Sequence, residues 1–164
     1  MILFASNVDP LAVTSFRFTL LGVALALGGC GEGDGSCGPG RALTAPEPDT
    51  ASRADVQEIL GRSCAVGGCH ASTPGAGGLA LPQADAAWVA SVVGVRSQEN
   101  ESMDLVAPGD PERSWLVYKI SGDLCRFTCD TKLGCGGQMP FGQPLAEPER
   151  GLIQAWIRHG ASID

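Results

Sequence analysis

Apolar residues recur at helical spacing in four stretches of the chain, and loops rich in glycine and proline separate them. In the first stretch, Ser52 and Asp55 have the form of a capping box, and this stretch leads directly into Cys64. Its apolar residues lie three and four positions apart; they are Val56, Ile59 and Leu60. In the second stretch, from about Gln83 to Val93, Trp88 shares one face with three valines. Both patterns predict short amphipathic helices.

Two further helices are predicted in the C-terminal half. Asp110 before Pro111 is an N-cap followed by proline at the first helical position, and Gly122 is expected to end this helix. The last helix begins near Glu147, and Gly160 stands where a left-handed C-terminal cap belongs. Their apolar faces consist of Trp115, Leu116 and Ile120, and of Leu152, Ile153, Trp156 and Ile157. Because no convincing run alternates with a period of two, we expect a mainly α fold.

The N-terminal part follows a different pattern. Residues 16–29 consist of a short basic start, an apolar run too short to span a bilayer, and small residues, so we expect 1–29 to be a signal peptide. The end of this stretch, Leu27-Gly28-Gly29-Cys30, resembles a bacterial lipobox, which makes Cys30 the expected lipidation site and mature N-terminus. The alternative is a buried helix with an incidental cysteine. Residues 30–51 have little to bury and are expected to form a flexible tether. One folded domain, 52–164, follows.

Charge and composition exclude several functions. The formal net charge is -7, and the eleven basic residues are scattered, so we do not expect nucleic acid as a partner. The chain contains two histidines, neither of which follows a nucleophile elbow, and it shows no phosphate loop or carboxylate dyad. Ordinary catalysis is therefore not expected.

Candidate chemistry is concentrated in one motif. Cys64 and the pair Cys69-His70 bring two thiols and an imidazole together, as c-type haem attachment requires, because the thiols add to haem vinyl groups and the histidine ligates the iron. The usual motif has two residues between its cysteines, whereas this one has four. A second iron ligand is available in Met139, because Pro140 and the glycines around it favour a loop that holds a side chain in place.

Several alternatives stay open at this stage. Met139 could simply cap the core, and Met103 or His159 could be the second ligand instead. We interpret His159 as an exposed residue that the C-terminal end of a helix favours. The two thiols and the imidazole of the motif could also bind zinc together with a later cysteine, although an oxidising compartment draws thiols into disulfides.

One series of segments resembles a known family in its order along the chain. The segments are Ile59-Leu60, Cys64 to His70, Gly77 to Leu81, Val106 to Ser114, Lys119 to Gly122, Met139-Pro140 and Trp156 to Ala161. They look like the single-haem cytochrome c domain of exported proteins from planctomycetes and their allies. This resemblance implies a cytochrome c-like helical fold with long Gly/Pro-rich loops, whose C-terminal helix crosses the first. It also implies a covalent haem c at Cys64 and Cys69, with His70 and Met139 as axial ligands of the iron.

The expected function follows from this resemblance and from the export signal. The chain would be a membrane-anchored c-type cytochrome that transfers single electrons, an electron carrier rather than a catalyst. Its acidic surface predicts a redox partner with a basic docking face. The lipid anchor places it in the bacterial cell envelope, most simply on the outer membrane, with the folded domain in the periplasm or at the cell surface.

The competing hypothesis is a haem-free, disulfide-braced lipoprotein domain that acts as a binding or envelope module. Exported cysteines usually pair. If haem takes the two motif cysteines, an even set remains with three possible pairings, namely Cys37, Cys125, Cys129 and Cys135. Without haem, the motif cysteines could pair with each other.

Overall fold

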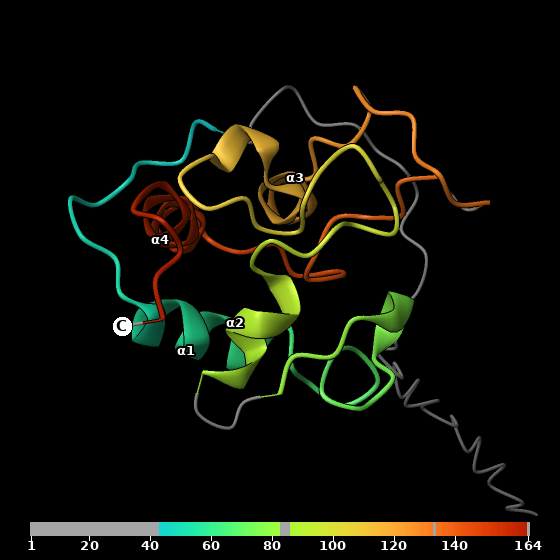
Figure 1. Ribbon diagram of the computed structural model, residues 1–164, viewed down its shortest axis with the longest axis horizontal. Coiled ribbons are helices and arrows are strands. Elements are labelled where there is room, and N and C mark those ends of the chain that lie inside the picture. The colour runs from blue at the N-terminus through green and yellow to red at the C-terminus, as the bar shows by residue number, and fades with distance from the viewer. Residues whose placement is uncertain (1–42, 83–85, 133, 164) are drawn as a thin grey trace, which may run out of the picture.

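The regular structure of the chain is helical (Figure 1). The computed structural model describes residues 43–82, 86–132 and 134–163. Its elements are α1 (Arg53–Ser63), the 3₁₀ turn η1 (Ala76–Gly78), α2 (Ala87–Val92), the 3₁₀ turn η2 (Pro111–Arg113), α3 (Trp115–Ser121) and α4 (Glu147–Arg158). Within these ranges the only β pairing consists of isolated bridges, so the mainly α fold class is confirmed. The expected signal peptide, Cys30 and Cys37 lie outside the described residues.

Helix α1 begins where the capping box predicts. The backbone N–H of Asp55 donates to the hydroxyl of Ser52 at 3.2 Å, and the N–H of Ser52 donates to the carboxylate of Asp55 at 2.9 Å. The predicted apolar face is buried. At the other end, the N–H of Cys64 donates to the carbonyl of Leu60 at 2.9 Å, so Cys64 directly closes the helix.

The third predicted helix is divided in two. Asp110 is an N-cap as predicted, but it caps the 3₁₀ turn η2 by accepting from the N–H of Arg113 at 3.1 Å. Ser114 then adopts an extended conformation and interrupts the helix. Its hydroxyl donates to the carbonyl of Asp110 at 2.8 Å and accepts from the N–H of Ala107 at 2.9 Å. This side-chain bonding competes with the helical pattern. Gly122, with φ of 77°, ends α3 as predicted.

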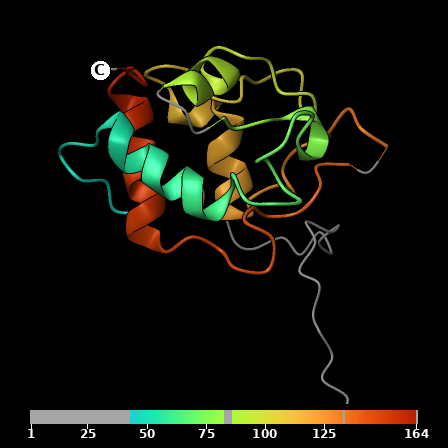
Figure 2. The same cartoon turned by 90° about the horizontal axis from the view of Figure 1, so that it is seen from below.

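The core lies where α1, α3 and α4 meet. In Figure 2, α1 lies across α4, and both α1 and α3 contact α4. Three buried tryptophans fill this region, Trp88, Trp115 and Trp156. The rings of Trp88 and Trp156 are 5.3 Å apart, which joins α2 to α4. None of the helices in the described ranges combines the length and the apolar character needed to cross a membrane.

Part of the expected tether lies against α4. Ala45 is buried, and the carboxylate of Glu47 pairs with the guanidinium of Arg158 at 2.7 Å. Pro46 packs against Gly151 so closely that a Cβ atom at residue 151 would lie 1.8 Å from the Pro46 carbonyl oxygen. The glycine in α4 therefore creates the space in which residues 45–47 are seated.

Replacing this glycine tests the contact. We expect Gly151→Ala to lower the free energy of unfolding by about 1–3 kcal/mol, because overpacking outweighs the gain of about 1 kcal/mol in helix propensity. The matched control is Gly67→Ala, since a Cβ at residue 67 meets nothing within 4 Å. Urea denaturation of both variants measures the difference. If Gly151→Ala were as stable as the parent chain, the packing of Pro46 on α4 would be wrong.

Candidate functional site

An apolar cavity lies beside the core. Its volume is about 410 Å³, which is within the range of sites for small molecules and cofactors. Three parts of the chain line it: the segment from the end of α1 to Leu81, the stretch from the end of α2 to Leu105, and α3 with Met139. The surface of the cavity is mainly apolar. Its polar side chains include Glu99 and Lys119, and also Arg96 and Gln98, which are exposed. An apolar interior with a small number of polar groups is the usual form of a ligand site.

His70 is held in a fixed orientation at this cavity. Its ring Nδ1 donates to the backbone carbonyl of Leu79 at 2.9 Å, because a carbonyl oxygen can only accept. In the neutral ring, Nε2 then carries the free lone pair. Metal-binding histidines in proteins are commonly oriented in this way, through the ring nitrogen that does not touch the metal. The backbone N–H of His70 donates to the carbonyl of Cys64 at 3.1 Å, which brings the two residues together.

The two cysteines of the motif have different environments. Cys64 is a free thiol, lines the cavity and is only 8% exposed. Burial raises the pKa of the Cys64 thiol to about 11, so it stays neutral at physiological pH. Cys69 is partly exposed, does not line the cavity and is disulfide-bonded. Between them, Gly67 and Gly68 lie in an exposed loop that accommodates the longer spacing.

Met139 reaches the cavity from a loop attached to α3. Its backbone N–H donates to the carbonyl of Lys119 at 2.8 Å, and the side-chain amide of Gln138 donates to the carbonyl of Ile120 at 3.0 Å. The other ligand candidates lie elsewhere. Met103 is buried in the hydrophobic core and does not line the cavity, and His159 is exposed at the end of α4. Met139 therefore joins the motif residues at one site.

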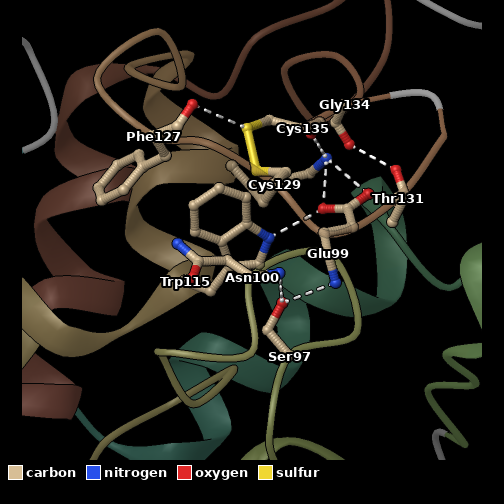
Figure 3. A network of polar contacts seen from close by, with 10 residues as sticks. Ser97, Glu99, Asn100, Trp115, Phe127, Cys129, Thr131, Gly134 and Cys135 are labelled. Atoms are coloured by element: carbon tan, nitrogen blue, oxygen red, sulfur yellow. Dashed lines mark hydrogen bonds and ion pairs between the residues drawn. A yellow bond between two sulfur atoms is a disulfide. The ribbon is translucent and has the colours of Figure 1, made fainter.

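A partly buried ion pair holds the loop that precedes Met139 (Figure 3). The ammonium of Lys119, 10% exposed, contacts the Glu99 carboxylate at 2.9 Å and donates to the carbonyl of Cys135 at 2.9 Å. Glu99 also accepts from the indole N–H of Trp115 at 2.8 Å, so each charge has several partners. Sequence reasoning missed this cluster. The one available sign was a lysine at Lys119 within the apolar stretch of α3.

The cysteines after α3 brace the same loop. Cys129 and Cys135 form a disulfide, which is one of the pairs that the sequence left open. Cys125 is also disulfide-bonded. The backbone N–H of Asp130, inside this disulfide loop, donates to the carbonyl of Glu99 at 2.8 Å. The loop is thus fixed to α3 and to residue 99 before the chain reaches Met139.

Comparison with known proteins gives no relative for this chain. No protein-family model, no curated protein and no solved structure matches it significantly. Across the described ranges, no three or more His, Cys, Asp or Glu side chains are grouped so that they could hold a metal ion by themselves. The function must therefore be argued from the cavity and the residues around it.

The raised pKa of Cys64 predicts a loss of stability at high pH. In the unfolded chain a cysteine ionises near pH 8.5, whereas in the folded chain the pKa of Cys64 is about 11. The stabilising contribution is complete below about pH 8.5 and is lost as pH rises through about 11, by on the order of 3 kcal/mol in total.

Urea denaturation of the unloaded chain and of Cys64→Ala, from pH 8 to pH 11, measures this contribution. The free energy of unfolding of the parent chain should fall relative to that of the variant as pH rises. Because other titrating groups, such as Tyr118, are present in both proteins, they cancel in the difference. A difference that does not change with pH would contradict the burial of the thiol.

Proposed function

We propose that this domain holds one haem c in the apolar cavity and carries single electrons as a membrane-anchored c-type cytochrome. One observation carries the proposal. The free thiol of Cys64 and the imidazole of His70, which belong to one motif, line the same cavity as the thioether of Met139, which lies far from them in the sequence. The order of the motif alone does not require this arrangement.

The residues present fit the proposed group. Haem iron takes histidine and methionine as its axial ligands in electron-carrying cytochromes, and methionine raises the potential. Bound haem would supply an iron that alternates between the ferric and ferrous states. The chain would do the rest: the carbonyl of Leu79 orients His70, the bond to Lys119 places Met139, and the apolar lining keeps water from the site.

The arrangement of the helices is consistent with the resemblance. In cytochrome c-like folds the first and last helices cross, and here α1 lies across α4 (Figure 2). The motif follows α1 directly, and the methionine loop lies between α3 and α4. We propose a cytochrome c-like fold on this basis, with the four-residue spacing taken up by the loop at Gly67 and Gly68.

Location and partner complete the proposal and rest on the sequence. A lipid on Cys30 would anchor the chain to the cell envelope, most simply to the outer membrane. The net charge of -7 favours a redox partner with a basic face, and such docking weakens as salt rises.

A haem-free, disulfide-braced module is the second candidate. It is favoured by one observation, namely that Cys69 is already disulfide-bonded, together with Cys125 and the pair Cys129 and Cys135. This candidate predicts that the cavity takes up no haem, so the following titrations distinguish the two functions.

Titration of the purified full chain with haem tests the proposed function. We expect saturation at one haem per chain, with an absorption spectrum of a six-coordinate iron, because two ligand side chains line the cavity. The variant His70→Ala should lose this spectrum. The matched control His159→Ala should keep it, since His159 is exposed and lies outside the cavity. No saturable binding by the parent chain would refute the proposal.

The role of the second ligand has its own pair of variants. We expect Met139→Leu to retain haem but to lower its reduction potential and to allow imidazole to bind at the iron, because the thioether is lost. The control Met103→Leu removes a thioether that lies in the core and should leave the potential unchanged. Potentiometric titration of each loaded variant measures the effect. Equal potentials for parent and Met139→Leu would show that another group ligates the iron.

A further inference from the structure

The two thiols of the motif do not share one face of the chain. In the usual motif the cysteines are three positions apart, so a helical turn places both on the same side. Here Cys64 and Cys69 are five positions apart, α1 has already ended at Ser63, and Gly68 between them has a φ of 83°, in the left-handed region. Only Cys64 lines the cavity.

The backbone fixes this difference. The backbone N–H of His70 donates to the carbonyl of Cys64 at 3.1 Å, which places the two ends of the motif loop side by side. The carbonyl of Cys69 accepts from the N–H of Ala76 at 2.8 Å, so Cys69 belongs to the turn that leads away from the motif. Cys69 is also disulfide-bonded, whereas Cys64 is free.

We propose that Cys64 alone forms a thioether to haem, while Cys69 remains in a structural disulfide. This inference rests on the proposed function, because it concerns how the same cavity retains its group. One vinyl group of the haem would stay intact. The four-residue spacing then has a physical role. It leaves the Cys64 thiol at the cavity, where it can attach haem, and places the Cys69 thiol away from the cavity, where it forms a disulfide.

The chemistry of this attachment balances without a further reagent. The S–H bond of Cys64 adds across one vinyl C=C bond: a C–S bond forms, the π bond breaks, and the hydrogen goes to the other vinyl carbon. Neither an oxidant nor a reductant is consumed. Attachment at Cys69, in contrast, would need a reductant to open its disulfide first, and an oxidising compartment opposes that step.

A matched pair of variants tests the assignment. The parent full chain, Cys64→Ser and Cys69→Ser are each produced together with a cytochrome maturation system. Mass spectrometry of the denatured proteins measures covalently bound haem. Visible absorption spectra of their alkaline pyridine complexes are also recorded, because the position of the band depends on how many vinyl groups of the haem remain. We expect the parent and Cys69→Ser to carry one covalent haem with one vinyl group left. Cys64→Ser should release its haem completely on acid extraction.

Two safeguards keep the outcome clear. Non-reducing peptide mapping of the loaded parent chain should show Cys64 bearing haem and Cys69 in a disulfide, which does not depend on whether Cys69→Ser folds. Incubation of the purified full chain with ferrous haem should produce the same single thioether if the maturation system does not accept the motif.

The contrary results separate the two ideas. Haem on the Cys69 peptide, or a band typical of no remaining vinyl group, would each overturn the single attachment and leave the proposed function standing. Haem bound without any thioether would overturn both the single attachment and the assignment as a c-type cytochrome. A parent chain that takes up no haem by either route would end both proposals.

Discussion

Close packing of the protein interior is the constraint that makes an apolar cavity in this fold significant. Protein interiors are packed almost as densely as organic crystals, and empty space costs the dispersion contacts of the atoms around it. Elsewhere this small domain obeys the rule, since Trp88 and Trp156 are buried and their rings are in contact. Yet it keeps an apolar cavity of about 410 Å³ beside α3. The cavity lies at Cys64, whose thiol is free, and at His70, whose imidazole is held in one orientation. An apolar cavity of this size can accommodate a small molecule or a cofactor.

The polar contacts around Lys119 explain how a loop without regular structure can hold Met139 at the cavity. The lysine uses its side chain to hold Glu99 and the carbonyl of Cys135, and its own carbonyl to hold the N–H of Met139. The disulfide between Cys129 and Cys135 shortens the free loop and lowers the entropy lost on ordering it. A partly buried ion pair is weak evidence for stability. Here its contacts, together with the disulfide, hold the backbone that leads to Met139.

Local signals in the sequence predicted where helices begin and end better than they predicted the break in the third helix or the contacts between segments. The capping box at Ser52 and the caps at Asp110 and Gly122 act within a few residues, so they could be recognised directly. The break in the helix at Ser114 depends on a hydrogen bond between the Ser114 hydroxyl and Ala107. The packing of residues 45–47 on α4 depends on the absence of a side chain at Gly151. Both are contacts between elements, and periodicity carries no information about them.

The candidate site shows the same division between local and distant information. The motif and the Met139 loop were recognisable from residue type and order, whereas the choice between Met139 and Met103 needed the cavity. The sequence also could not predict that Cys64 is free while Cys69 is disulfide-bonded, because disulfide pairing cannot be deduced from spacing alone. In an exported protein every cysteine can become a disulfide, so attachment of a cofactor competes with pairing. Burial of Cys64 in an apolar cavity limits the access of oxidants and of other thiols to its sulfur, and this agrees with Cys64 being free while Cys69 is disulfide-bonded.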